Sequence, residues 1–163
     1  MGTVPNVTKR FYEGGPMTRG EQCKANGFRC CALSLVRVAL GFIFFMHGAH
    51  KALGWFGGPG LEAMVGMMTK NGLPAALAYM VIFGELLGGI ALMAGFLSRL
   101  AALGIGIIMA GAIFTVHGKN GFFLQNQGFE YNLALISMAL AVMVGGGGCL
   151  ALDSIFCRKK EAA

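Results

Sequence analysis

Residues 74–97 read PAALAYMVIFGELLGGIALMAGFL, an apolar run in which Glu85 is the only charged side chain. A helix needs about 20 largely apolar residues to cross the hydrocarbon core of a membrane, and this run is long enough. Pro74 opens the run and the polar pair Ser98-Arg99 follows it, which marks both of its ends. The run therefore predicts a membrane-spanning helix.

Three similar runs lie elsewhere in the chain, at residues 30–49, 100–117 and 131–152. Charged residues, Pro and Gly separate them, and the polar, glycine-bearing stretch 118–130 precedes the last run. Only 12% of the 163 residues are charged, and the mean hydropathy is +0.67. We therefore expect an all-α fold, a polytopic membrane protein in which residues 30–153 form a four-transmembrane-helix bundle between tails at 1–29 and 154–163.

Positive charge predicts the orientation of the bundle, because the loops on the cytoplasmic side of a membrane protein are enriched in Lys and Arg. One side of the predicted bundle carries only Lys51, Lys70 and Lys119. The other side carries nine basic residues: Lys9, Arg10, Arg19, Lys24, Arg29, Arg99, Arg158, Lys159 and Lys160. An even number of spans puts both termini on one side, so both are predicted to be cytoplasmic.

The net charge of +6 comes mainly from these tails, where it suits anionic lipid headgroups better than a nucleic acid. We therefore expect membrane lipids as partners and no nucleic acid. Residues 1–29 lack the short apolar core of a cleavable signal, so the first span should remain as an anchor. The Gly14-Gly15-Pro16 stretch suggests a tail that is loose or ordered by a protein partner.

The five cysteines all fall in the predicted cytoplasmic half of the chain, where thiols are normally reduced. They are Cys23, Cys30, Cys31, Cys149 and Cys157, and no two of them have C-x-x-C spacing. We therefore expect neither a structural disulfide nor a zinc site, and we interpret these residues as small packing side chains.

Two opposite charges, Arg37 and Glu85, fall near the middle of the first and second spans. A charge at that depth costs a few kcal/mol or more unless it has a partner, so we expect the two to pair. Helical periodicity puts Arg37 on one face with Gly41, Gly48 and Lys51, while Glu85 shares its face with Gly88 and Gly89. Two interpretations stay open: the pair locks the bundle together, or it forms a proton route or the polar wall of a headgroup pocket.

Three histidines, His47, His50 and His117, lie near the predicted outer end of the bundle. Such a group could hydrogen-bond a quinone or ligate haem or a divalent metal, and interfacial histidine is the commoner outcome. His50 should face the headgroups, which leaves His47 and His117 as the inward pair. No metal site is expected and haem is disfavoured. At the cytoplasmic end, Asp153 is expected to form an ion pair with Arg99 or with Arg37.

Several short motifs occur together in a recognisable order. Arg37 lies in the first span and His47-Gly48-Ala49-His50-Lys51 ends it; the other motifs are Gly84-Glu85-Leu86-Leu87-Gly88-Gly89, Gly95-Phe96-Leu97-Ser98-Arg99 and Leu152-Asp153. Over about residues 33–156 the chain resembles the DoxX family. The resemblance implies a small four-helix protein of the bacterial inner membrane, and its pattern singles out Arg37, Lys51, Glu85, Arg99 and Asp153.

One DoxX-like protein is a subunit of thiosulfate:quinone oxidoreductase, and others are membrane partners of redox or stress-defence enzymes. The resemblance therefore implies a subunit of a quinone-linked redox system. From the intramembrane polar residues we expect a pocket formed by Arg37, His47, Lys51, Glu85 and His117. The chain has no flavin motif, iron–sulfur cysteine set or secure haem pair, so a complete enzyme is not expected.

Two other functions remain open. The first is a non-catalytic scaffold or accessory subunit that docks a protein partner through its N-terminal tail or its helix faces. The second is a small-solute transporter, because charged residues near the bilayer midplane occur there as well.

Overall fold

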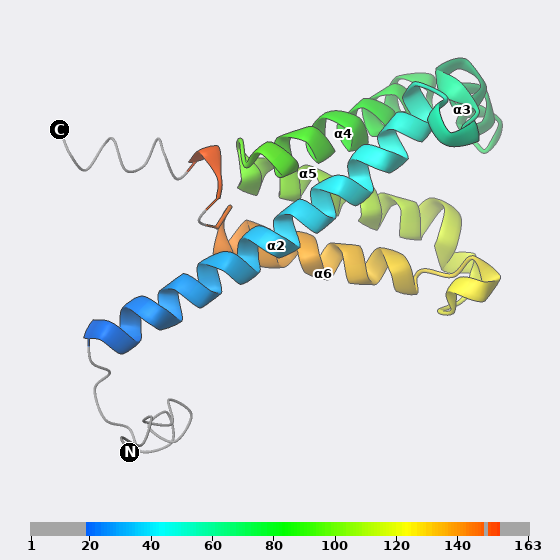
Figure 1. Cartoon of the computed structure of the whole chain (residues 1–163). Coiled ribbons are helices and arrows are strands. Elements are labelled where there is room, and N and C mark those ends of the chain that lie inside the picture. Colours follow the sequence, from blue (N-terminus) through cyan, green and yellow to red (C-terminus); the bar gives the residue numbers. More distant parts are fainter. Residues whose placement is uncertain (1–18, 149, 154–163) are drawn as a thin grey trace.

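The computed structural model describes residues 19–148 and 150–153, with side chains from residue 27 onward, and this part of the chain contains helices and no strand. Five α-helices follow one another (Figure 1): α2 (Arg19–Ala52), α3 (Gly60–Lys70), α4 (Ala75–Ala94), α5 (Ser98–Ala112) and α6 (Glu130–Gly145). A π-helical turn at Ile113–His117 extends α5, and short 3-10 turns lie at Trp55–Gly57, Gly118–Asn120 and Leu124–Asn126.

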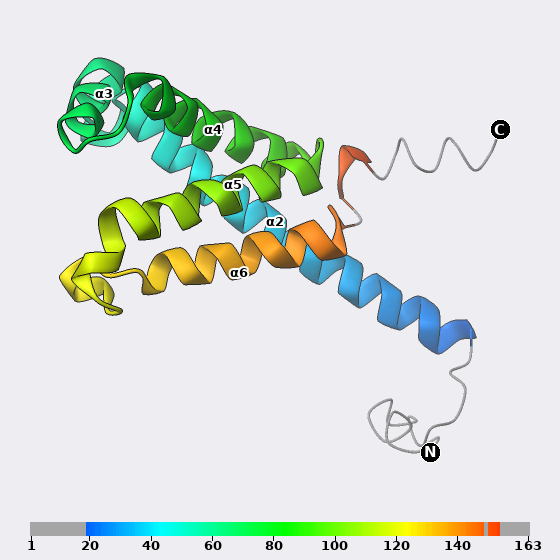
Figure 2. The ribbon, with the colours of Figure 1, turned by 180° about the vertical axis from the view of Figure 1, so that it is seen from behind.

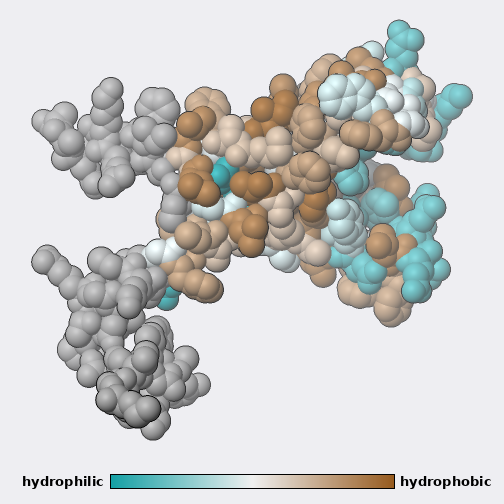
Figure 3. Space-filling view, in the orientation of Figure 1, coloured by the Kyte–Doolittle hydropathy of each residue, from teal (hydrophilic) through white to brown (hydrophobic). Residues whose placement is uncertain are grey.

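Three of the described helical segments are long and apolar enough to cross a membrane: Gly27–Ala52, Ala75–Ala94 and Ser98–Asn120. The fourth, α6, is also apolar, but its 16 residues span only about 24 Å at 1.5 Å per residue. Hydrophobic residues cover the middle of the molecule, and hydrophilic ones gather at the end that carries α3 and the loop before α6 (Figure 3). The chain is a helical membrane protein.

The helix boundaries differ from the expected spans in three places. Helix α2 begins at Arg19, eleven residues before the predicted first span, and α3 occupies a segment that was expected to be a loop. Helix α6 ends at Gly145, although the fourth span was predicted to reach residue 152. It ends there because Gly146 (φ 83°) and Gly148 (φ 74°) adopt left-handed backbone angles that interrupt a right-handed helix.

Helices α2 and α4 run antiparallel and approach closely at glycines, as the faces inferred from the sequence predicted. A β-carbon on Gly48 would lie 2.5 Å from the backbone of Leu86, and one on Gly89 would lie 2.4 Å from the nitrogen of Phe45. Gly41 meets the Met93 nitrogen in the same way, at 2.8 Å. No side chain fits in these places, so the glycines set the distance between the two helices.

Helix α5 packs against the other face of α4 and then against α6, and α6 also contacts α2, so the four long helices form a closed bundle (Figures 1 and 2). Isoleucines of α5 contact the predicted Gly84-x-x-x-Gly88 motif: Ile108 lies over Gly84 and Ile105 over Gly88. The main core includes Leu40, Phe44, Leu92, Ala102, Ile105, Leu135, Ala139 and Val142.

Helix α3 covers the end of the bundle where α2 stops. Its Val65 packs with Ala78 and Ile82 of α4 in a second, smaller core. At the opposite end, α2 continues well beyond its neighbours, as Figure 1 shows. Helix α4 is therefore flanked by α2 over one half and by α3 over the other.

Candidate functional site

The junction between α2, α3 and α4 holds an ion pair between Lys51 and Glu85. The Lys51 Nζ atom donates to both carboxylate oxygens of Glu85, at 2.7 Å to Oε1 and 2.6 Å to Oε2. The Glu85 side chain is 2% exposed and that of Lys51 is 20% exposed. The carboxylate is thus enclosed, while the ammonium group reaches toward the surface.

Helix geometry places this pair at mid-depth. Glu85 lies ten residues after the start of α4 at Ala75, or about 15 Å along a helix about 30 Å long. Lys51 is the penultimate residue of α2, and because Gly48 packs on Leu86, its side chain reaches back along α2 to the carboxylate of Glu85 on α4. An isolated charge at such a depth costs several kcal/mol, and the mutual contact offsets much of that cost.

Lys51 keeps one hydrogen-bond donor in reserve. A lysine ammonium has three N–H groups, and Glu85 accepts from Nζ twice. Within residues 19–148 and 150–153, no further group accepts a hydrogen bond from Nζ. The ammonium of Lys51 is thus paired with the buried carboxylate of Glu85, and its third N–H group is free to donate to an acceptor from outside the bundle.

The predicted pair between Arg37 and Glu85 is wrong. Because Gly48 faces Leu86 in the antiparallel α2–α4 packing, Arg37 lies level with about residue 97. That position is twelve residues from Glu85, or about 18 Å along the helix axis. The register between two helices cannot be read from the sequence, so estimating depth along each helix led to the wrong cation. Lys51, not Arg37, contacts the carboxylate of Glu85.

Arg37 instead hydrogen-bonds to the end of α4 and to the segment after α6, at the other end of the bundle. Its Nη1 atom donates to the carbonyl oxygens of Leu92 and, at 3.0 Å, Met93. Its Nε donates to Gly147 (2.7 Å) and its Nη2 to Leu150 (3.1 Å). The first two carbonyls belong to the last turn of α4, where a cation is favoured by the helix dipole. Buried at 1% exposure, Arg37 ties α4 to the segment after α6.

Asp153 caps the start of α5. Its Oδ1 accepts a hydrogen bond from the backbone N–H of Leu97 and its Oδ2 from that of Ser98, both at 2.9 Å. Burial acts to raise the pKa of Asp153, but these hydrogen bonds and the nearby Arg37 guanidinium outweigh it and hold the pKa below its usual value. Of the two partners predicted for Asp153, Arg99 is wrong, since it is exposed and no ion pair joins it to Asp153. Arg37 acts on Asp153 through its charge, although their side chains form no direct ion pair.

The histidines do not join the ion pair. The exposed His47 hydrogen-bonds through Nδ1 to the carbonyl oxygen of Ile43 in its own helix, at 2.9 Å. His117 uses its Nδ1 on the carbonyl of Gln127, at 2.7 Å. The five-residue pocket expected from the sequence thus reduces to Lys51 and Glu85. Within the described part of the chain, no three His, Cys, Asp or Glu residues are grouped to hold a metal ion.

The cysteines also differ from expectation at one position. Cys30 is disulfide-bonded, so the prediction that these residues stay reduced is wrong there, whereas the exposed Cys31 is free. Spacing along the chain could not reveal this, because a disulfide requires proximity in the folded bundle. The predicted C-terminal tail and most of the N-terminal tail lie outside the described residues.

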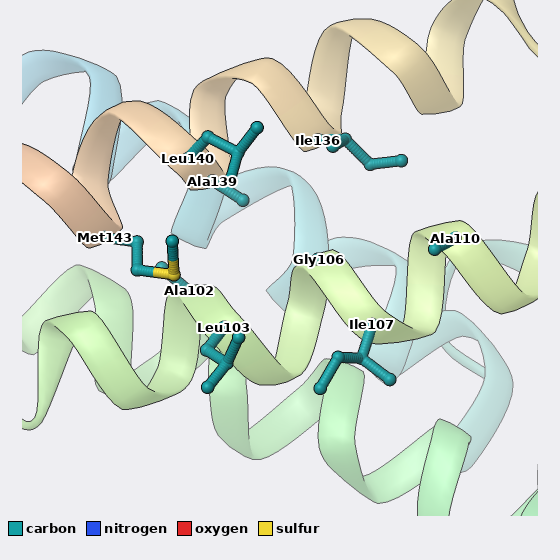
Figure 4. A pocket seen from close by; sticks show the side chains of 9 residues that line it. All are labelled: Ala102, Leu103, Gly106, Ile107, Ala110, Ile136, Ala139, Leu140 and Met143. Atoms are coloured by element: carbon teal, nitrogen blue, oxygen red, sulfur yellow. The ribbon is translucent and has the colours of Figure 1, made fainter.

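An apolar cavity of about 200 Å³ lies between α5 and α6 (Figure 4), open to the surface on the side where Leu103, Ile107 and Leu140 are exposed. Every side chain that lines it is apolar: Leu103, Gly106 and Ala110 belong to α5, and Ile136, Leu140 and Met143 belong to α6. No polar group points into it. The cavity is separate from the ion pair between α2 and α4.

Apolar helices of membrane-spanning length, with an ion pair buried between two of them, define an integral membrane protein. The family model described as DoxX matches residues 32–118 of the chain. The chain therefore belongs to the DoxX family, as its motifs suggested.

Curated proteins are similar to this chain over most of its length. A Bacillus subtilis (strain 168) protein named "Putative oxidoreductase CatD" is 35% identical over 127 residues, covering 78% of this chain and 88% of that protein. A Haemophilus influenzae (strain ATCC 51907 / DSM 11121 / KW20 / Rd) protein described as uncharacterized is 33% identical over 138 residues, covering 81% and 96%. No solved structure matches the chain.

Proposed function

We propose that this protein is the membrane subunit of a quinone-linked redox system in a bacterial inner membrane, crossing it four times with both ends in the cytoplasm. Family membership and a relative named as an oxidoreductase support a redox role. The distribution of Lys and Arg supports the orientation. Helix α6 and the segment after it together supply the fourth crossing.

The observation that carries the proposal is the free N–H of Lys51 beside the enclosed carboxylate of Glu85. A quinone carbonyl is a hydrogen-bond acceptor, and reduction of a quinone to a hydroquinone takes up two electrons and two protons. The ammonium of Lys51 can donate to that oxygen and stabilise negative charge there, while Glu85 keeps the lysine charged and in place. The electrons come from a partner protein.

The residues present fit one carbonyl of a quinone. They do not fit the wider headgroup pocket expected from the sequence, because Arg37 is buried at the other end of the bundle with four of its five N–H groups donated to backbone carbonyls. His47 and His117 each hydrogen-bond a backbone carbonyl away from the ion pair. Lys51 and Glu85 are thus the residues we assign to the site: Lys51 contacts the quinone, and Glu85 positions Lys51.

Quinone-dependent turnover of the native complex in membranes tests this assignment. Lys51→Met and Glu85→Gln should each lower turnover by about tenfold or more, since each removes a charge-assisted hydrogen bond. Glu62→Gln is the matched control, because Glu62 is an exposed carboxylate on the neighbouring α3. Equal turnover in all three variants, at equal amounts of folded protein, would exclude the site.

A second candidate is a non-catalytic accessory subunit, which the extension of α2 beyond the bundle favours (Figure 1). Gly27, Phe28 and Arg29 are exposed there and are free to contact a partner. Deletion of residues 1–29 should then abolish partner association, while Glu85→Gln should weaken the bundle without a separate loss of turnover. Transport of a small solute stays a prediction that no observation favours.

A further inference from the structure

The cavity between α5 and α6 has the shape and chemistry to hold a hydrocarbon chain. Its lining runs from Ala102 to Ala110 on α5, eight residues or about 12 Å along the helix. At about 200 Å³ it is smaller than the pockets of about 300 Å³ or more that take drug-sized ligands. A segment of one acyl chain suits this volume, and α5 has the length and composition of a membrane-spanning helix.

The guanidinium of Arg99 lies at one end of this cavity. Arg99 lies one helical turn before Ala102 and Leu103 of the lining, on the same side of α5. Its Nε and Nη2 atoms are each 3.6 Å from the place that a β-carbon on Gly146 would take. Gly146 follows the last turn of α6, which supplies Met143 to the lining. The guanidinium therefore lies across the gap between the two helices.

The charge of Arg99 is not compensated by a neighbouring side chain. Asp153 gives both carboxylate oxygens to the amides of Leu97 and Ser98, and its charge is balanced by Arg37. Among the residues for which the structure describes side chains, none accepts a hydrogen bond from Arg99 or forms an ion pair with it. The end of the cavity is thus open to an anion.

We infer that α5 and α6 form a binding site for an anionic phospholipid, whose phosphate binds Arg99 and whose acyl chain occupies the cavity. Guanidinium groups bind phosphate through paired N–H donors. A lipid headgroup at the membrane interface supplies such a phosphate. The positive charge at the mouth selects an anionic headgroup, and the uniformly apolar lining selects hydrocarbon. This site is remote from Lys51 and does not depend on the proposed redox role.

Native mass spectrometry of the delipidated full-length protein tests the site. Phosphatidylglycerol and phosphatidylcholine with identical acyl chains would be titrated in turn. We expect phosphatidylglycerol to bind about tenfold more tightly, because it carries a net negative charge, whereas the quaternary ammonium of phosphatidylcholine offsets the charge of the same phosphate beside Arg99. Arg99→Gln should remove this preference. Arg29→Gln, which removes an exposed charge from α2, a helix that contributes no residue to the cavity lining, should leave it unchanged.

Filling the cavity tests the acyl-chain half of the inference. Gly106→Leu should weaken binding of both lipids, because a β-carbon there has room beside Ala139 and the rest of the side chain enters the cavity. The control is Gly104→Leu, whose β-carbon would meet nothing within 4 Å on the exposed face of the same helix. Ala110→Leu gives a second filled variant should the first one fail to fold.

Three results would overturn the inference. Equal losses in Arg29→Gln and Arg99→Gln would show diffuse attraction instead of a site. Unchanged binding in both filled variants would show that no chain enters the cavity. Conversion of a dimer to a monomer by Gly106→Leu, without loss of lipid, would show that a second copy of the protein occupies this face.

Discussion

Arg37, Glu85 and Asp153 have two different roles in this protein. Arg37 and Asp153 bind backbone groups, whereas Glu85 binds another side chain. Arg37 and Asp153 satisfy backbone groups at the ends of helices, which have no partner within the helix itself. Of these three residues, only Glu85 forms an ion pair with another side chain, that of Lys51. The first two residues therefore belong to the architecture, and the ion pair is what remains for function.

At the level of single residues, the sequence predicted which side chains matter better than it predicted their partners. Depth and helical periodicity identified Arg37, Lys51 and Glu85 as inward-facing, and the structure confirms that Arg37 and Glu85 are buried. Their partners depended on the register between helices and on backbone carbonyls that carry no sequence signal. For that reason the expected Arg37–Glu85 and Arg99–Asp153 pairs are absent from the described structure.

The Lys51–Glu85 pair should show strong coupling in a double-mutant cycle. Lys51→Met or Glu85→Gln alone leaves one buried or half-buried group without its counter-ion and should lower the free energy of unfolding by about 3 kcal/mol. The double variant should cost less than the sum of the two. Denaturant unfolding in detergent measures the free energy of unfolding of the unmodified protein, the two single variants and the double variant. Additive losses would show that the two side chains do not interact.

Asp153 should make stability depend on acid. Its folded-state pKa is lowered, so its contribution is fully present above the unfolded-state pKa of about 4 and is lost as pH falls through the lower folded value. Asp153→Asn should cost about 1 kcal/mol at neutral pH, because it removes the negative charge at the helix N-terminus and one of the two acceptor oxygens. The difference in melting temperature between the two proteins should shrink as pH falls below about 4. A difference independent of pH would contradict this account.

At the level of helices, glycine explains both a success and a failure of sequence reasoning. The shared face of Gly41 and Gly48 correctly predicted where α2 contacts its neighbour. The run Gly145–Gly148 was expected to lie inside the last span, yet it ends α6. Composition alone cannot separate these cases, because a glycine that permits close packing and a glycine at positive φ look alike in a sequence.

Gly48→Ala tests the close contact between α2 and α4. The new β-carbon would lie 2.5 Å from the Leu86 backbone, which cannot move aside as a side chain could. We expect a loss of about 2 kcal/mol or more, as for overpacked cores, read as a lower melting temperature in detergent. Gly104→Ala is the control, because its β-carbon meets nothing within 4 Å. It should be neutral or slightly stabilising.

For the molecule as a whole, the apolar pattern correctly predicted a helical membrane protein, and its motifs correctly indicated the family. The sequence did not predict α3, which covers the end of α2 at Ala52 and packs on Ala78 and Ile82 of α4. Its eleven residues are too few to span a membrane, so a search for long apolar runs passes over them. The enclosure of Glu85 is thus a property of the assembled bundle.

The central claim is that the Lys51–Glu85 pair responds to quinone. Infrared difference spectroscopy of the native complex, recorded between the oxidised and reduced states of its quinone, observes this response directly. The account predicts a carboxylate band that shifts on reduction, disappears in Glu85→Gln and persists in Glu62→Gln. A spectrum that is the same in Glu85→Gln as in the unmodified protein would contradict it and leave the ion pair a purely structural element.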